Sequence, residues 1–190
     1  DNQLFSAGIG TSLGGSHVSG PTGSSASGFS SELSFRLHAL YVLGFDFAYA
    51  PLDDGMEADG LVFGNDLRMS ALIYLVPTKW FSLYAKLGVE ADGFGGLFDW
   101  DAAGTSYHGG GGLEIPVTDN WYIGAEFLVL IPGVDSLVEH ASQAVESQIN
   151  VMRGGLSAAD AAEAQAAAPG VSDYISASNF RLAASVRYYF

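Results

Sequence analysis

The sequence predicts an all-β chain, an eight-stranded antiparallel up-and-down transmembrane β-barrel. Three observations lead to this fold class: eight segments alternate between an apolar and a mixed face, the connections between them alternate between short and long, and the charges within the segments fall on the mixed face. No window of about 18 or more uncharged apolar residues is present, so no membrane-spanning helix is predicted. The pattern covers residues 1–190 as a single domain.

Alternation with a period of two residues defines the strands. In the closing segment "FRLAASVRYYF", residues 180–190, every even-numbered position is apolar or aromatic, and both arginines are odd-numbered. The segment 80–91 likewise separates Leu83 and Leu87 from Lys86 and Glu90. The same pattern and the turn signals between segments predict strands at roughly 3–13, 30–40, 43–51, 66–76, 80–91, 106–117, 121–132 and 175–190.

The connections between these strands alternate in length. Those at 40–42, 77–79 and 118–120 are short, whereas those at 14–29, 52–65, 92–105 and 133–174 are long. An up-and-down order therefore places all four long connections at one end of the barrel and both termini at the other. The first long connection is rich in Gly and Ser, which predicts a mobile loop.

The fourth long connection, 133–174, differs in composition and predicts a helical hairpin. An N-cap at Ser157 precedes an Ala-rich run that stops at Pro169 and Gly170. The first helix, of about four turns, has an apolar stripe that packs on the second helix, on neighbouring loops or on a partner protein. The stripe, which we regard as the candidate partner-binding surface, consists of Leu137, Val138, Ala141, Val145, Ile149 and Met152.

The charges divide into a balanced set within the strands and an acidic excess in the long connections. The chain has 21 acids, 7 bases and a net charge of −14, which argues against nucleic acid as a partner. Most acids outside the strands fall in the long connections, where Arg153 is the single base. The strand charges are expected to form an ion-pair network that fills a narrow lumen: Glu32, Arg36, Asp46, Asp66, Arg68, Lys86, Glu90, Glu114, Glu126, Arg181 and Arg187.

The parity of a position, odd or even along its strand, assigns a residue to one of the two faces but does not tell which face of the barrel is inside. A soluble lipocalin-like barrel has its apolar face inside, and a membrane barrel has it outside. Gly and Ser among the strand charges suit a narrow, ion-filled lumen, which favours the membrane barrel. So do aromatic residues near the short turns, where a membrane-interface girdle is expected: Trp80, Phe81, Trp121, Tyr188 and Phe190.

Three stretches resemble the small outer-membrane β-barrel family that includes the OmpA barrel domain and OmpX. They are "FSLYAKLGVEADG" (81–93), "YHGGGGLEIPVTDNWYIGAEFLVL" (107–130) and "FRLAASVRYYF" (180–190). The resemblance implies a Gram-negative outer membrane reached after signal-peptide removal, contact with its lipid, and long loops outside the cell. It also implies that the barrel-assembly machinery reads the terminal aromatic strand. The long fourth connection departs from the family pattern.

These features predict a non-enzymatic structural or protein-interaction module that acts through its acidic outer loops. Three alternatives stay open: a narrow pore, a subunit of a larger envelope complex, and a lipid-modifying enzyme. The enzyme would use Ser106 and His108, with Glu90 or Asp92 as the acid. No cofactor or metal is predicted, although loop acids such as Asp53 supply the oxygen ligands that Ca²⁺ prefers.

Overall fold

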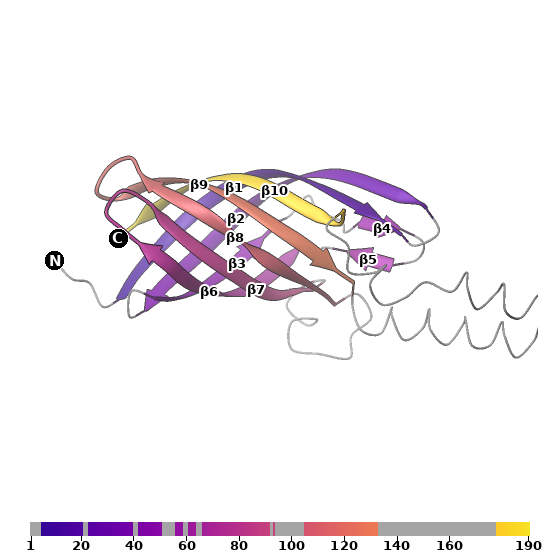
Figure 1. Ribbon diagram of the computed structural model, residues 1–190, viewed down its shortest axis with the longest axis horizontal. Coiled ribbons are helices and arrows are strands. Elements are labelled where there is room, and N and C mark those ends of the chain that lie inside the picture. Colours follow the sequence, from indigo (N-terminus) through magenta and orange to yellow (C-terminus); the bar gives the residue numbers. More distant parts are fainter. Residues whose placement is uncertain are drawn as a thin grey trace, which may run out of the picture.

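A computed structural model describes residues 5–20, 23–39, 42–50, 56–58, 61–63, 66–91, 93, 105–132 and 178–190. In this part of the chain, eight strands close into an antiparallel barrel in the order β1-β10-β9-β8-β7-β6-β3-β2 (Figure 1). Strands that follow one another along the chain are neighbours around the barrel, and β1 pairs with β10 to close it. The predicted eight-stranded up-and-down barrel is confirmed.

Ten strands are present in the described residues, eight of them in the barrel. The barrel strands are β1 (Phe5–Ser19), β2 (Ser25–Ala39), β3 (Leu43–Tyr49), β6 (Leu67–Pro77), β7 (Ser82–Ala91), β8 (Ser106–Pro116), β9 (Trp121–Ile131) and β10 (Phe180–Tyr189). Two short strands that the sequence did not predict, β4 (Met56–Ala58) and β5 (Leu61–Phe63), form a separate hairpin within the second long connection.

Helical structure was predicted for the fourth long connection. That helical hairpin, at 133–174, lies outside the described residues. Within the described residues, no helix is long and apolar enough to cross a membrane. The short turns, the start of β1 and the end of β10 lie at one end of the barrel, which we call the inner end. The opposite end is called the outer end.

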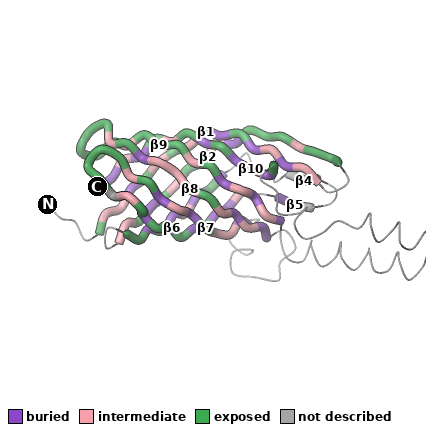
Figure 2. The backbone as a smooth tube through the Cα atoms, viewed as in Figure 1, coloured by how far each residue is buried: buried purple, intermediate pink, exposed green. Residues whose placement is uncertain are grey.

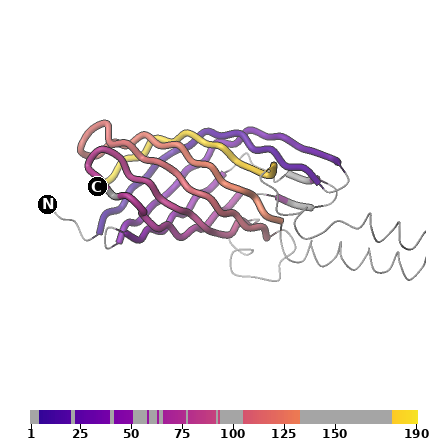
Figure 3. Tube along the Cα trace, in the orientation of Figure 1, coloured from indigo at the N-terminus to yellow at the C-terminus, as the bar shows by residue number. Residues whose placement is uncertain are grey.

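The first long connection differs from its prediction as a mobile loop over 14–29. Strands β1 and β2 continue through it as a paired ladder that extends to Ser19 and Ser25. Beyond the ladder, the N–H of Gly20 donates to the carbonyl of Ser24 at 2.9 Å, and Gly23 has a φ of 98°, a backbone conformation that glycine adopts readily. In Figure 3 this indigo and violet hairpin projects beyond the other barrel strands. The sequence did not predict these outer parts of β1 and β2, because Gly and Ser do not produce a clear alternation of apolar and polar residues.

Two of the short inner turns have the same construction. The N–H of Thr78 donates to the carbonyl of Phe81 (3.0 Å), and Thr118 bonds Trp121 in the same way (3.2 Å). Each threonine hydroxyl also accepts a hydrogen bond from the backbone N–H of that same aromatic residue, at 3.0 and 3.1 Å. Both turns reverse the chain tightly, as predicted, and present aromatic side chains at the inner end.

The barrel wall has its apolar face outside and its polar face inside. Buried and exposed residues alternate along the strands (Figure 2). On β7, Leu87 is 68% exposed, whereas the adjacent Lys86 is buried. Arg36 and Arg181 are among the largest fully buried side chains. The structure therefore settles the question that parity left open: the core inside the barrel is charged, and large apolar side chains cover the outside.

Candidate functional site

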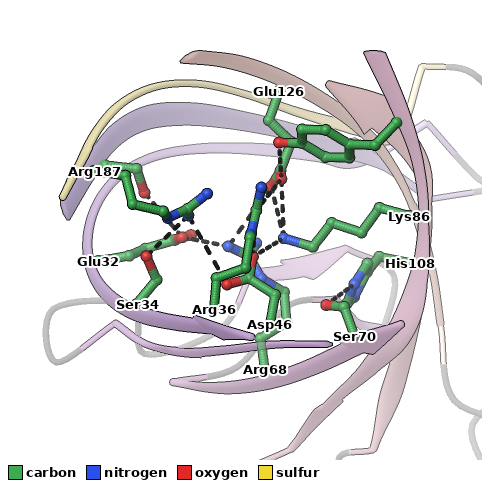
Figure 4. Close-up of polar contacts among 12 residues, drawn as sticks. Glu32, Ser34, Arg36, Asp46, Arg68, Ser70, Lys86, His108, Glu126 and Arg187 are labelled. Carbon is green, nitrogen blue, oxygen red and sulfur yellow. Dashed lines mark hydrogen bonds and ion pairs between the residues drawn. The ribbon is translucent and has the colours of Figure 1, made fainter. Parts of the chain in front are cut away.

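The candidate site is the barrel interior, where ten charged side chains converge. Each lies at an inward-facing position of its strand, because alternate residues of a strand point to the same face. Five are bases and five are acids, so their formal charges cancel. Figure 4 shows members of this set, among them Arg36, Asp46 and Lys86, meeting inside the barrel. The set consists of Glu32, Arg36, Asp46, Arg68, Lys86, Glu90, Glu114, Glu126, Arg181 and Arg187.

Arg36 on β2 is the centre of the inner half of this network. Its guanidinium bonds Asp46 at 2.7 Å and Glu114 at 2.9 Å. Arg187 also donates to Glu114, and Lys86 donates to Asp46 at 2.8 Å. Each of these acids therefore contacts at least two bases, which compensates for removing the carboxylates from water.

The outer half of the network is arranged around Glu32. Arg68 donates to one carboxylate oxygen of Glu32, and Arg181 lies 3.4 Å from the other. Arg181 also contacts Glu90 at 3.4 Å, and its Nε donates to the hydroxyl of Ser16 at 3.0 Å. The hydroxyl of Ser12 donates to Glu32 at 3.0 Å, so serine hydroxyls supply part of the hydrogen bonding of these charged groups.

Glu126 on β9 connects the two halves. One of its carboxylate oxygens lies 2.9 Å from Nζ of Lys86 and the other lies 3.9 Å from Arg68. A cavity of only about 10 Å³ for water centres remains among the network side chains, which is space for about one molecule. The network therefore fills the lumen rather than lining a channel, as expected for an eight-stranded barrel.

An aromatic layer lies at the inner end, below the network. The hydroxyl of Tyr74 bonds Nε2 of His38, and the hydroxyl of Tyr189 lies 3.1 Å from the same nitrogen. The rings of Tyr74 and Tyr84 pack with centroids 5.5 Å apart. Tyr189 also donates to Glu114 at 3.2 Å, so this layer is bonded to the ion pairs above it.

An apolar layer lies at the outer end, above the network. Phe63 and Ala58 of the β4–β5 hairpin are buried against Val18 of β1 and Leu130 of β9. Because Val18 and Leu130 occupy inward-facing positions near the outer ends of their strands, the hairpin covers the mouth of the barrel. The lumen thus has three layers: apolar at the outer end, ionic in the middle and aromatic at the inner end.

A serine, a histidine and a glutamate meet just below the apolar layer. The hydroxyl of Ser70 lies 2.9 Å from Nε2 of His108, and Oε1 of Glu90 lies 3.1 Å from its Nδ1. Ser70 is thus at hydrogen-bond distance from Nε2, whereas the enzyme alternative proposed Ser106 as the serine. This order of groups activates a nucleophile in serine hydrolases, but all three side chains are buried inside the barrel.

The other predicted site residues fall into three groups. Asp66 is not a member of the network: it lies at the outer end just before β6, and its carboxylate accepts a hydrogen bond from the backbone N–H of Gly93 at 3.0 Å. The predicted interface aromatics lie at or beside the inner turns and strand ends, and Trp80 is 82% exposed. The six predicted partner-binding residues, Leu137 to Met152, lie outside the described residues, as does Asp92.

Sequence reasoning missed three kinds of residue in the lumen. Ser70 and Tyr189 have the inward parity of Arg68 and Arg187, so the same alternation that located the charges indicates their positions. Phe63 had no such signal, because it lies on a three-residue strand within a long connection. Among the described residues, no group of three or more His, Asp or Glu side chains is placed to hold a metal ion.

Comparison with known protein families finds no match for this chain, and comparison with curated proteins finds none either.

Proposed function

We propose that the protein is a transmembrane β-barrel of a Gram-negative outer membrane. The observation that supports this most strongly is the inverted polarity of the barrel. Nine of the ten charged network side chains are buried inside and the tenth, Glu126, is nearly so, whereas large apolar side chains from all eight barrel strands are exposed outside. In water such a surface would far exceed the apolar patches of soluble monomers, whereas lipid solvates it. A closed barrel also leaves no unpaired strand edge in the hydrocarbon region.

The inner end of the barrel supports the proposed orientation and family. The exposed side chains of Trp80 and Phe190 and the half-exposed Trp121 suit a membrane–water interface. The final strand, β10, ends on aromatic residues, as in the OmpA and OmpX family that the sequence resembles. In this proposal the barrel-assembly machinery reads that strand, after removal of a signal peptide, and the long connections lie outside the cell.

We propose a non-enzymatic role as a structural or protein-interaction module, in which the acidic outer loops make the interactions. The three-layered lumen supports this choice over a narrow pore, because each layer blocks the path through the barrel. It also disfavours the lipid-modifying enzyme, because the side chains of Ser70 and His108 are buried inside the barrel. Unchanged lipid A in the mass spectrum after Ser70→Ala, Ser106→Ala and His108→Ala substitutions is the expected result, and altered acylation would favour the enzyme.

The proposed interaction surface includes the apolar stripe predicted from Leu137 to Met152 in the fourth long connection. A partner of the envelope or the extracellular space would bind there, including in a larger envelope complex. Deletion of 134–172 should leave a folded barrel, seen as heat-modifiable migration in gel electrophoresis, and should abolish co-purification of the partner from native membranes. Unchanged co-purification would contradict this role for the fourth connection.

The membrane location has its own test. The folded protein should remain with outer membranes through washes with high salt and alkaline carbonate, and should be released only by detergent. Refolding should require detergent or lipid, because the exposed apolar wall aggregates in water. A protein that refolds as a soluble monomer in buffer alone would contradict the proposal.

A further inference from the structure

We propose that the outer wall of the barrel contains a binding groove for one acyl chain of a phospholipid. The groove crosses strands β9, β10, β1, β2 and β3 on the exposed face and has a volume of about 630 Å³. That volume lies within the range of roughly 300–1,000 Å³ that is typical of small-molecule sites. The inference rests on the proposed membrane location and adds a defined lipid site to it.

Two parallel rows of outward-facing side chains form the sides of this groove, which we call the β1 groove. Both rows follow the register of the strands, so residues within a row are direct cross-strand neighbours. Five of the nine side chains are aromatic, and aromatic rings give rigid apolar walls. The first row is Trp121, Tyr188, Ile9, Phe35 and Phe47, and the second is Val186, Thr11, Leu33 and Tyr49.

Thr11 on β1 makes the depression between the rows. It has the smallest side chain of either row and lies between the larger Val186 and Leu33. Its hydroxyl donates a hydrogen bond to the backbone carbonyl of Glu32 at 2.9 Å, so this polar atom is satisfied within the wall. The methyl group of Thr11 is thereby left as its apolar contact surface.

The chemistry of the β1 groove selects an uncharged, elongated ligand. Its lining contains no Lys, Arg, Asp or Glu side chain. The rings of Trp121 and Tyr188 pack edge to face with centroids 5.2 Å apart at one end, which gives that end a defined shape. The groove opens onto the apolar outer wall, which we assign to the hydrocarbon region of the membrane. In that region lipid acyl chains are uncharged, elongated and present at high concentration, so a lipid acyl chain is the ligand that fits.

The position of the β1 groove points to a phospholipid as the source of that chain. Trp121 is the first residue of β9 after an inner turn, and Tyr188 is one residue before the end of β10. The groove thus begins near the inner end of the barrel. In an outer membrane the inner leaflet is made of phospholipid, whereas the glycolipid occupies the outer leaflet.

Fluorescence quenching by chain-brominated phospholipid tests the site. Trp80 and Trp100 are replaced by Phe, so that Trp121 beside the β1 groove is the only tryptophan. The barrel is inserted in phospholipid vesicles that contain an increasing fraction of brominated chains. Three variants are compared in this background: Thr11→Leu fills the depression, Thr11→Val removes the hydroxyl at nearly constant size, and Ala71→Leu enlarges an exposed residue of β6 elsewhere on the wall.

A preferred site should quench Trp121 more steeply than random mixing of lipids allows. We expect this excess quenching in the parent protein and in the Thr11→Val and Ala71→Leu variants, and its loss to the random-mixing curve in Thr11→Leu. Random quenching in all four proteins, or excess quenching in Thr11→Leu, would overturn the inference. So would protection of Trp121 from brominated chains together with cross-linking to a second copy, since a protein would then occupy the groove.

Failure of the membrane proposal would be distinguishable. In that case no protein would float with vesicles or show heat-modifiable migration, and a variant retaining Trp80 alone would not be quenched either. If all variants insert and only the excess quenching of Trp121 is missing, the barrel is a membrane protein and the groove holds no preferred chain.

Discussion

The interior and the outer wall of this barrel are built from the same strands and differ in almost every physical property. Arg36 is 1% exposed inside, and its neighbour in the chain, Leu37, is 43% exposed outside. The interior is ionic and its groups are bonded to one another, whereas the wall is apolar and its side chains contact what surrounds the barrel. A shift of one residue in register would exchange the two faces.

The difference shows what each surface requires. Inside, carboxylates are stable because each meets bases or hydroxyl groups at close range, as Asp46 does with Arg36 and Lys86. Outside, the wall needs no specific partner, but it needs a solvent that accepts apolar area. The interior should therefore respond to loss of a single partner, and the wall should respond to gain of a charge.

The largest expected effect is in the interior. Arg36→Leu removes the base that bonds Asp46 and Glu114, and both acids stay buried. Breaking a buried ion pair by removing one partner costs about 3–5 kcal/mol. Urea unfolding in lipid vesicles, followed by tryptophan fluorescence, measures the change in the free energy of unfolding.

The matched control combines the substitution with Asp46→Asn. Because the two residues contact one another, the double variant should lose less stability than the sum of the single variants. Simple additivity would mean that the contact between Arg36 and Asp46 contributes little to the stability of the lumen.

The wall should give the next largest effect. Leu87→Arg places a charge on the outward face of β7, where the side chain of Leu87 is 68% exposed. On a lipid-facing position near the bilayer midplane, an arginine costs about 2–4 kcal/mol. In water the same charge at an exposed position changes stability by no more than about 0.5 kcal/mol. Unfolding measurements that show no loss in vesicles would contradict the proposed lipid contact.

A smaller effect is expected at Gly88, where the strand backbone and a lumen side chain pack closely. A Cβ added at Gly88 would lie 2.7 Å from the ring of His108 and would also collide with the carbonyl of Met69. Overpacking of this kind costs about 1–3 kcal/mol, so Gly88→Ala should lower the unfolding free energy by that amount.

Gly15→Ala is the comparison for Gly88→Ala, because the nearest atom to a Cβ at Gly15 is 3.8 Å away. This variant should unfold within about 0.5 kcal/mol of the parent protein. Equal effects of the two substitutions would show that lost glycine flexibility, and not the collisions with His108 and the Met69 carbonyl, determines the cost.

The smallest predicted effect concerns the hydroxyl below the hairpin. Ser70→Ala removes the partner of Nε2 of His108, and a net hydrogen bond contributes about 1 kcal/mol. Ser27→Ala, which removes an exposed hydroxyl bonded to His17, should change stability much less. Unfolding of the two variants at the same urea concentration would contradict the structural role assigned to Ser70.

The sequence predicted the barrel and the charges of its lumen because both depend on a period of two residues. Arg181 and Arg187 could be assigned to one face of β10 from parity alone, and both are buried among acids. The pattern could not say which face was inside, since an inverted barrel has the same alternation. The structure shows which face is inside, because the sheet closes into a barrel and the side chain of Arg36 is buried in the lumen.

Two other features were beyond sequence reasoning for physical reasons. The outer halves of β1 and β2 are rich in Gly and Ser, which have too little apolar contrast to show an alternation. The β4–β5 hairpin has three residues in each strand, which is too short for a period to be detected. The position of Phe63 over the lumen depends on tertiary contacts with Val18 and Leu130.

The central claim, that the apolar wall faces lipid while the ionic face is enclosed, has a direct measurement. The chain contains no cysteine, so single cysteines can be placed along β9 from Ile123 to Leu128 and spin-labelled. In vesicles, labels at 123, 125 and 127 should be relaxed strongly by oxygen, which concentrates in lipid, and weakly by a water-soluble nickel complex. Labels at 124, 126 and 128 should be reached poorly by both, and strong relaxation by nickel at 123, 125 and 127 would contradict the account.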